Sequence, residues 1–185
     1  MRSRSAILEA CAQLIAEEGF PGVTIEAVAQ RSGTAKTTIY RHWADRDALL
    51  VDAFGLRSEP VDEAPDTGSL REDLVAVMSA LAVSLRDTER CAILRSLADS
   101  ATRHPELSQL HISYVAECRR PLTEALGRAV ERGSLPSDLD RDEAVSMLAG
   151  PLFYRAMVSW QPIDDGFVAG VVDSLLAAVG ARAAT

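Results

Sequence analysis

The sequence predicts an all-α protein of about nine helices, arranged as two helical domains. Apolar residues recur at helical spacing in one segment after another, and no segment shows the two-residue alternation of a half-buried strand. Alanine accounts for 29 of the 185 residues and aromatic residues for only 5%, a composition that favours helix over sheet. With 48% hydrophobic residues, the chain can also bury a core of ordinary size.

The first helix is predicted by an apolar stripe near the N-terminus. Gly19 is a suitable residue to end this helix, because glycine readily adopts the left-handed conformation found just after helix ends. Phe20 and Pro21 follow it. The stripe, with the i, i+4, i+7 spacing of one helix face, consists of Ile7, Leu8, Cys11, Leu14 and Ile15.

A short second helix is expected to begin after Thr24. A threonine at this position can accept a hydrogen bond from the first turn, and Val23 and Val28 are spaced as a hydrophobic staple around it. Glu26 suits the positive end of the helix dipole. The helix is expected to end at Ser32–Gly33.

A third helix is expected at once, beginning at Thr34 or Ala35 and ending near Trp43. Two short helices joined by a tight glycine turn form a helix-turn-helix, whose second helix enters the major groove of DNA. Ile39 and Trp43 can anchor one face of that helix. The spacing alone also fits a helical unit that is basic by chance. The other face carries side chains suited to phosphates and base edges: Lys36, Thr37, Thr38, Tyr40 and Arg41.

The net charge of −8 first argues against a nucleic-acid partner, but its distribution does not. The first 50 residues hold six basic and six acidic side chains, so the whole excess of acid lies after residue 50. Residues 29–46 contain four basic side chains and one acidic side chain, which gives a local charge of +3. A small basic strip on an acidic chain predicts weak binding to DNA of arbitrary sequence, with a shallow salt dependence.

The run VTIEAVAQRSGTAKTTIYRHWADRDALL resembles the DNA-binding domain of the tetracycline-repressor (TetR) family of bacterial transcription regulators. The resemblance extends back through ILEACAQLIAEEGF and covers about the first 55 residues. Thr34-Ala35 departs from the common Val-Ser of the family, which leaves open which residue caps the third helix. The resemblance implies that Thr24 contacts a DNA phosphate and that Arg46 makes a second contact with the DNA backbone. It also implies that the recognition helix uses Lys36, Thr37, Thr38, Tyr40, Arg41 and His42.

The boundary between the two domains is predicted by a break in the helical pattern. A fourth helix is capped by Asp45, and residues 57–68 then hold two prolines, a glycine and four acids without periodicity. Ser69 and Glu72 form a capping box that opens the next helix. We therefore expect a three-helix DNA-binding domain with a helix-turn-helix over residues 1–55. A C-terminal regulatory domain is expected over residues 56–185.

Four further helices are expected in the C-terminal domain, over about residues 88–102, 105–133, 141–160 and 165–180. Pro121 lies inside the second of these, and Gly150-Pro151 lies inside the third. Because proline removes a backbone donor and its ring collides with the preceding turn, both helices are expected to bend.

The last helix carries an apolar surface that is too wide for a lone helix facing water. Either these residues complete the chain's own core, or they pack against a second subunit. The resemblance implies the second arrangement, a four-helix bundle around a two-fold axis, which would place two recognition helices about 34–36 Å apart. The predicted interface of this homodimer consists of Phe167, Val168, Val171, Val172, Leu175 and Val179.

A ligand pocket is expected between the two bent helices, because bent helices do not pack flush along their whole length. Arg95 and His111 could be its polar groups. The same residues could equally be ordinary core residues, and the resemblance implies an effector site without identifying the small molecule. The predicted lining is Met78, Leu81, Leu94, Arg95, His111, Tyr114, Cys118, Phe153, Tyr154, Met157 and Trp160.

Two apparent metal sites are rejected. His104, His111 and Cys118 are seven residues apart, so neighbours along one helix would be about 10.5 Å from each other, too far to share an ion. Residues 138–142 begin like a calcium loop, but Glu143 stands where that loop needs glycine. No hydrolase, nucleotide-binding or di-iron motif is present in the sequence. No metal, cofactor or catalytic activity is therefore expected.

The sequence also predicts a cytoplasmic location. No apolar run approaches the roughly 20 residues that cross a bilayer, and Glu9 and Glu17 interrupt the apolar N-terminal segment that superficially suggests a signal peptide. Cys11, Cys91 and Cys118 form no paired motif, which favours buried free thiols.

The predicted function is a TetR-like transcriptional regulator, a homodimer that represses from a palindromic DNA operator until a small-molecule effector releases it. The fourth helix would link the DNA-binding domain to the helix that starts at Ser69. Two alternatives are a helical small-molecule-binding protein without operator specificity and a helical-bundle enzyme. An intact DNA interaction after replacement of Lys36 and Tyr40 would contradict the recognition-helix assignment.

Overall fold

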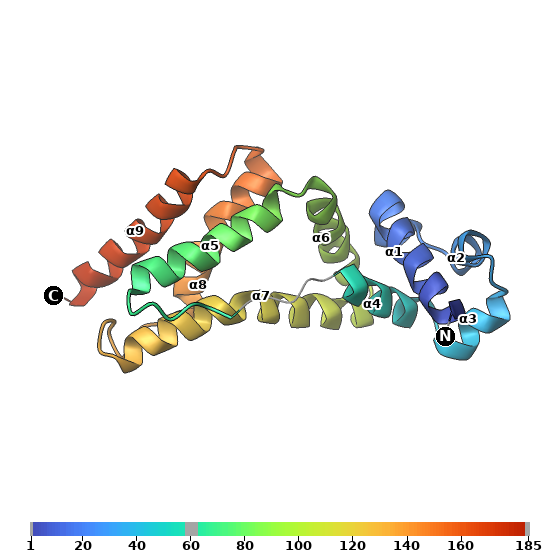
Figure 1. Ribbon diagram of the computed structural model, residues 1–185, viewed down its shortest axis with the longest axis horizontal. Coiled ribbons are helices and arrows are strands. Elements are labelled where there is room, and N and C mark those ends of the chain that lie inside the picture. The colour runs from blue at the N-terminus through green and yellow to red at the C-terminus, as the bar shows by residue number, and fades with distance from the viewer. Residues whose placement is uncertain (1, 58–62, 184–185) are drawn as a thin grey trace. The chain divides into compact units, whose positions relative to one another are not determined.

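The structure is a computed structural model that describes residues 2–57 and 63–183. Within those ranges it contains nine α-helices, one π-helical turn and no strands, so the predicted all-α fold is confirmed (Figure 1). No helix in the described ranges is long and apolar enough to cross a membrane. The elements are α1 (Arg2–Gly22), α2 (Ile25–Ser32), α3 (Lys36–His42), α4 (Arg46–Arg57), α5 (Leu70–Arg86), α6 (Thr88–Ala101), α7 (Pro105–Glu131), α8 (Arg141–Tyr154), η1 (Arg155–Ser159) and α9 (Asp165–Ala183).

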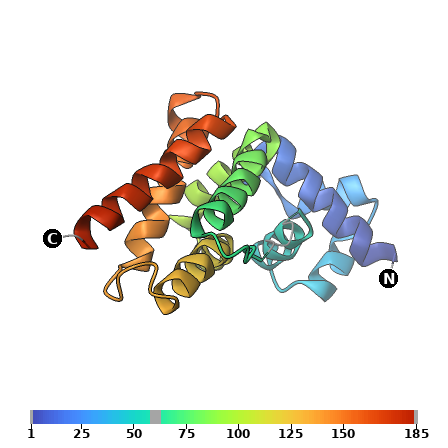
Figure 2. The same ribbon diagram turned by 60° about the vertical axis from the view of Figure 1, so that its left-hand side comes forward.

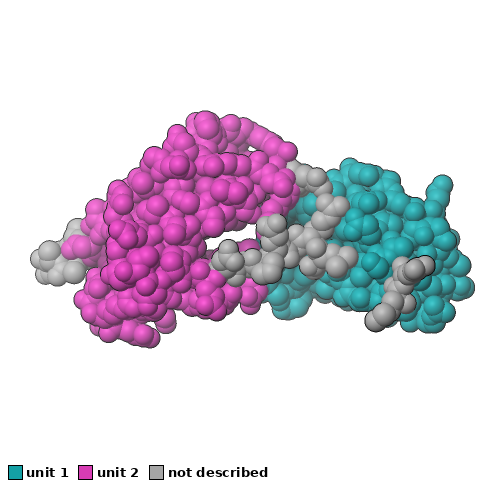
Figure 3. All heavy atoms as spheres, in the orientation of Figure 1, with its two compact units in different colours: residues 1–60, 92–115 teal, residues 61–91, 116–185 magenta. Residues whose placement is uncertain are grey.

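The helices form two compact units that differ from the two continuous segments expected from sequence (Figure 3). The first unit joins residues 1–60 to residues 92–115, and the second joins residues 61–91 to residues 116–185. Helices α6 and α7 therefore each contribute to both units. Part of the loop predicted over residues 57–68, namely residues 58–62, lies outside the described residues. The functional division at residue 55 stays a prediction.

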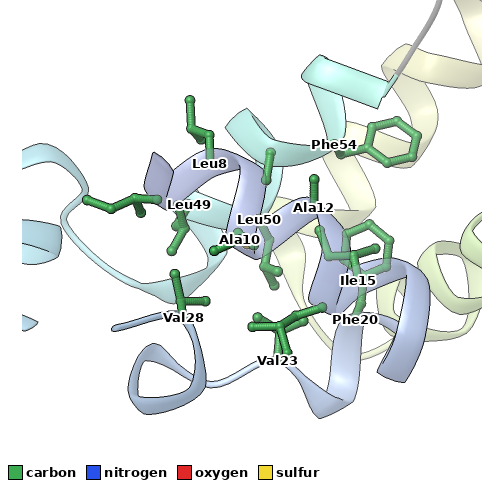
Figure 4. Close-up of a cluster of buried hydrophobic side chains, with 14 of the residues drawn as sticks. Leu8, Ala10, Ala12, Ile15, Phe20, Val23, Val28, Leu49, Leu50 and Phe54 are labelled. Carbon is green, nitrogen blue, oxygen red and sulfur yellow. The ribbon is translucent and has the colours of Figure 1, made fainter. Parts of the chain in front are cut away.

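The first unit is built on one apolar core shared by α1–α4 and parts of α6 and α7. Figure 4 shows side chains from α1, the α1–α2 turn, α2 and α4 converging on this core. Leu97 of α6 and Leu107 of α7 are fully buried in the same cluster. The Phe54 ring lies 6.0 Å from Phe20 and 5.2 Å from Tyr114 of α7, centroid to centroid. Two segments from beyond residue 90 thus belong to the core beneath the helix-turn-helix.

The α1–α2 turn begins where the sequence predicts the end of the first helix. Gly19 has φ 71° and ψ 172°, a conformation that interrupts α1 and that only glycine adopts readily. The Phe20 backbone N–H donates a hydrogen bond of 2.8 Å to the Ser96 hydroxyl of α6. A helix from the C-terminal half of the sequence therefore holds this turn directly.

Four helices begin at a residue whose side chain caps the first turn, and three of these caps were predicted from sequence. The side-chain oxygens of Thr24, Asp45 and Ser69 accept backbone N–H groups three residues later, at 3.1, 2.8 and 3.4 Å. These three caps confirm the helix starts predicted from sequence. Asp140 caps α8 in the same way, accepting the Glu143 N–H at 3.0 Å. The acids that superficially suggest a calcium loop thus include the N-cap of a helix.

The second unit is a helical layer in which α5, α8 and α9 pack side by side, as Figures 1 and 2 both show. Arg71 of α5 makes a two-pronged ion pair with Asp173 of α9, at 2.6 and 3.0 Å. Arg132 at the end of α7 binds Asp66 at 2.6 Å, and the Arg132 guanidinium lowers the pKa of that carboxyl. The shared core draws on Leu74, Met78, Leu126, Val145, Leu148, Leu152, Val168 and Val172.

The proline positions behave differently from the expectation. Helix α7 runs from Pro105 to Glu131 without a break at Pro121, and α8 continues through Gly150-Pro151 to Tyr154. The irregularity comes later, as the π-helical turn η1, which ends at Trp160 with φ 54°. A π turn inserts one extra residue and so changes the helix phase. Neither proline interrupts its helix, and the irregular geometry of this region lies one turn beyond Gly150-Pro151.

Candidate nucleic-acid interface

Helices α2 and α3 are joined by the tight glycine turn expected of a helix-turn-helix. Gly33 has φ 64° and ψ 26°, the left-handed conformation in which its N–H closes the end of α2 on the Ala29 and Gln30 carbonyls. The Thr34 N–H also bonds to the Ala29 carbonyl, at 3.0 Å. Ala35 is the N-cap of α3 and makes no side-chain cap, which settles the alternative that the sequence left open. Backbone hydrogen bonds, together with one from the Thr34 hydroxyl to the Ser32 carbonyl, therefore fix the turn that leads into α3.

Helix α3 is anchored by one face and presents the other to solvent. Ile39 is fully buried, and Trp43, which ends the helix, is 5% exposed. The Trp43 indole N–H donates to the Asp52 carboxylate of α4 at 2.9 Å, and Arg4 pairs with the same oxygen at 2.7 Å. Arg4 also lies over the Trp43 ring, 5.5 Å from its centroid. These contacts orient α3 on α4 before any ligand is present.

The outward face of α3 carries the polar side chains predicted to meet DNA. Lys36, Thr37, Arg41 and His42 are exposed, Thr38 is partly buried, and Tyr40 is 54% exposed although it is a large aromatic residue. Thr34 and Ala35 flank this face at its start, and Thr24 is exposed at the start of α2. The structure thus gathers the predicted DNA-binding residues on α3 and the start of α2, with Arg46 as the exception.

Most basic side chains around this face already have acidic partners. Lys36 of α3 forms an ion pair with Glu26 of α2, and Arg31 binds Glu17 of α1 at 2.7 Å. The hydrogen bond from Lys36 holds the pKa of the Glu26 carboxyl below its usual range, so the carboxylate stays ionised at neutral pH. Within residues 2–57 and 63–183, Arg41 forms no ion pair. The local charge of +3 counted from sequence is therefore largely balanced within the fold.

Arg46 has a structural role that the sequence did not predict. Its Nε donates to the Val23 carbonyl at 2.6 Å, and a terminal nitrogen donates to the Phe20 carbonyl. The other terminal nitrogen pairs with Asp47 at 3.0 Å, and Asp47 lies 3.4 Å from His104 at the start of α7. All three nitrogens of the guanidinium thus donate hydrogen bonds, two to the α1–α2 turn and one to α4. Arg46 therefore holds the turn that leads into Thr24, and its contact with the DNA backbone stays a prediction.

Replacing Arg46 with methionine should destabilise the fold by roughly 2–3 kcal/mol, because buried carbonyls and a carboxylate lose charge-assisted hydrogen bonds. Arg41→Met removes the same charge from an exposed side chain and should change the free energy of unfolding by less than about 0.5 kcal/mol. Thermal unfolding of the two variants measures both effects. An Arg46→Met chain that unfolds like the wild type but binds DNA more weakly would support the phosphate contact instead.

The residues predicted for the effector pocket do not form one cluster. Leu94 and Tyr114 pack against the core of the first unit, whereas Met78, Leu81, Phe153 and Met157 belong to the second. Arg95, His111 and Cys118 are partly buried. Tyr154 and Trp160 are 58% and 70% exposed. Tyr154 is the last residue of α8, and Trp160 directly follows the π turn. Their place in an effector pocket stays a prediction.

Part of the predicted dimer surface lies inside the single chain. Val168, Val172, Leu175 and Val179 are buried in the chain's own core, at the spacing of the α9 face that contacts α5 and α8. Phe167 and Val171 remain partly exposed. The Phe167 ring lies 3.4 Å from the Arg155 guanidinium carbon. For the four buried residues, the alternative interpretation of the sequence, that they complete the chain's own core, describes the structure.

Burial also accounts for two of the three cysteines. Cys11 and Cys91 are buried and belong to no disulfide, and Cys118 is partly buried. Removal from water raises the pKa of the Cys11 thiol to about 12, against an opposing effect of the nearby Arg46 charge. The prediction of buried thiols outside any disulfide is confirmed for Cys11 and Cys91.

A short helix fixed on its apolar side, placed after a glycine turn and carrying polar side chains outward, defines the class of helix-turn-helix DNA-binding proteins. Comparison with known proteins gives the family. Residues 7–53 match the model of bacterial regulatory proteins of the tetR family, and residues 64–175 match the tetracyclin repressor-like C-terminal domain. The chain belongs to the TetR family of bacterial transcriptional regulators.

The similarity to individual relatives covers nearly the whole chain. The DNA-binding transcriptional repressor TetR of Mycobacteroides abscessus is 32% identical and covers 94% of this chain and 92% of its own. The HTH-type transcriptional regulator YdeS of Bacillus subtilis is 28% identical, over 99% and 92%. The crystal structure of the TetR family transcription regulator SCO0332 is 32% identical with a TM-score of 0.70, covering 96% and 98%. The family assignment predicted from residues 1–55 is confirmed.

Proposed function

We propose that the chain acts in the cytoplasm as a homodimeric repressor that binds a palindromic operator and is released by a small-molecule effector. The observation that carries this proposal is the outward polar face of α3, held in place by the buried Ile39 and Trp43 on the opposite face. Such preorganisation lowers the cost of ordering side chains on binding. The M. abscessus relative is itself named a repressor, which sets the expected sign of regulation.

The proposed DNA contacts divide by the chemistry of their side chains. Arg41 and Lys36 offer donors to guanine edges or phosphates, and the threonine methyl groups of α3 suit the thymine methyl. Tyr40 and His42 would bind mainly phosphates. Thr24 already caps α2 with its hydroxyl oxygen, so its hydroxyl hydrogen remains for a phosphate oxygen. Thr34 and Ala35, at the start of α3, and Arg46, at the start of α4, complete the proposed set of DNA-binding residues.

The homodimer is proposed to form through the outer face of α8 and η1. Met147 and Tyr154 of α8 are 46% and 58% exposed and, seven residues apart, share one helix face. Val158 of η1 is 62% exposed. Trp160, 70% exposed, follows directly. A continuous strip of large exposed apolar side chains is typical of a protein interface. A two-fold contact here would bring two DNA-binding units to one operator.

Effector release requires coupling between the two compact units of each chain, and we propose that α6 and α7 supply it. Each of these helices crosses from one unit to the other, between residues 91 and 92 and between residues 115 and 116. Ser96 of α6 holds the Phe20 N–H, and His104 at the α6–α7 junction faces Asp47. A change in either helix would therefore act on the turn that precedes α2. This route adds to the link through α4 predicted from sequence.

The test is a DNase footprint of the purified chain on the DNA upstream of its own gene and of the neighbouring genes. We expect protection of two half-sites about one helical turn apart, since a two-fold dimer reads a palindrome in adjacent major grooves. Absence of any protected segment, with binding no tighter than to random-sequence DNA, would contradict the proposed operator function and leave a helical small-molecule-binding protein.

A further inference from the structure

The Lys36–Glu26 ion pair lies at the start of both helices of the helix-turn-helix. Lys36 is the first residue of α3, and Glu26 is the second of α2. Their side chains are 50% and 66% exposed, and neither is needed for the core. Residues at the N-terminus of a recognition helix are those that contact base edges. The ion pair therefore occupies a position from which sequence is read.

We propose that Glu26 is a positioning residue that determines DNA specificity by fixing and neutralising Lys36. The inference rests on the proposed operator function and adds to it a residue that does not itself touch the bases. An ammonium group has three donors. One donor is held by the Glu26 carboxylate, and two remain for acceptors such as N7 and O6 of guanine. The carboxylate would thus aim Lys36 at a base edge while cancelling its charge.

Cancelling the charge matters most for DNA of arbitrary sequence. Non-specific binding is driven by the release of counterions from phosphates, and each engaged cation adds about 0.9 to the salt slope. A lysine paired with a fixed carboxylate contributes little to that release, because the pair is neutral overall. Two other ion pairs of this unit, Arg31–Glu17 and Arg4–Asp52, act in the same direction. These ion pairs should therefore weaken the binding of DNA of arbitrary sequence. Arg41, which forms no ion pair within the described residues, remains able to contact DNA with its full charge.

Removing the Glu26 carboxylate should separate its effect on the orientation of Lys36 from its effect on the charge of Lys36. In Glu26→Gln, Lys36 is free to follow phosphates, so affinity for random-sequence DNA should rise roughly 3–5-fold for each DNA-binding unit engaged. The salt slope should steepen by about 0.9 per unit. Affinity for the footprinted upstream DNA should stay the same or fall, because Lys36 is no longer aimed. The ratio of specific to non-specific affinity should therefore decrease.

The experiment is a fluorescence-anisotropy titration of the full chain against the upstream duplex and a random-sequence duplex of equal length, at several salt concentrations. Glu18→Gln is the matched control, an equal change of charge at an exposed acid of α1 in the same compact unit. The double variant Glu26→Gln/Lys36→Ala shows whether the effect passes through Lys36. We expect Glu18→Gln to leave the affinity ratio unchanged, and the double variant to lose the gain on random DNA.

Three results would overturn the proposal. The first is an equal gain on both duplexes, since that is a simple effect of net charge. The second is a gain on random DNA that persists without Lys36. The third is no change on random DNA at all. A wild-type chain that binds both duplexes equally overturns the operator function and the inference together, and it is recognised without any variant.

Discussion

A Gly19→Ala variant should unfold at a temperature lower by roughly 5–15 °C, from a loss of about 2–4 kcal/mol. Two costs add at this position. The backbone conformation, φ 71° and ψ 172°, is strained for any residue with a Cβ atom. A Cβ built there would also lie 2.6 Å from the Ser96 hydroxyl oxygen. That oxygen cannot rotate away freely, because it accepts the Phe20 N–H.

Two further variants separate strain from collision. Gly33→Ala introduces a Cβ at another positive φ, 64°, but with no atom within 4 Å, so it should cost only about 1–2 kcal/mol. In a Ser96→Ala background, the Gly19→Ala change should cost less than in the wild type, since the colliding oxygen is gone. Thermal unfolding followed by circular dichroism measures all of these chains. Equal costs at Gly19 and Gly33 would show that α6 does not press on the α1–α2 turn.

The second large effect is expected at the proposed dimer face. Val158→Asp would place a carboxylate in an apolar contact, and burying an unpaired charge costs several kcal/mol. Because two copies of the substitution meet in a two-fold contact, dimer dissociation should become at least about 100-fold easier. Sedimentation of the wild type should give twice the chain mass of 19.9 kDa, and the variant should sediment as a single chain at micromolar concentration.

Val83→Asp is the control for this variant. Val83 of α5 is 63% exposed, against 62% for Val158, but it lies outside the α8–η1 strip. It should leave the oligomeric state unchanged. A Val158→Asp chain that still sediments as a dimer, or a wild type that sediments as a monomer, would contradict this dimer face. Because one operator engages two recognition helices, the monomeric variant should also lose the footprint.

Local sequence signals predicted most helix ends, because capping and glycine chemistry act within a few residues. Thr24, Asp45 and Ser69 cap the helices they were expected to cap, and Gly19 and Gly33 adopt the positive φ expected at helix ends. The outward polar face of α3 could be predicted for the same reason, since Ile39 and Trp43 lie four residues apart.

Contacts between distant segments could not be predicted. Nothing near Arg46 in sequence indicates that the carbonyls of Phe20 and Val23, more than twenty residues away, would take its donors. The hydrogen bond from Phe20 to Ser96 spans 76 residues. Glu26 was recognised as a first-turn acid, but its pairing with Lys36 depends on the angle between α2 and α3, which hydrophobic spacing does not fix.

In the C-terminal domain, two separate features limit what the sequence can predict. The apolar face of α9 was long enough to serve either its own core or a partner, and periodicity alone does not choose between them. The π turn at residues 155–159 adds a phase shift with no clear signal in sequence, and Trp160, which follows it, is 70% exposed. Proline did suggest irregular geometry in this helix, but one turn too early.

The central claim is that α3 reads DNA, and one titration tests it most directly. The measurement is the affinity for the footprinted upstream duplex of the wild type and of a Tyr40→Ala/Arg41→Ala variant. Both replaced side chains are exposed, so the variant should unfold within about 2 °C of the wild type. We predict at least a 100-fold weaker affinity, because each of the two side chains should contribute about 1–3 kcal/mol to DNA binding in each subunit. An unchanged affinity in the folded variant would contradict the account.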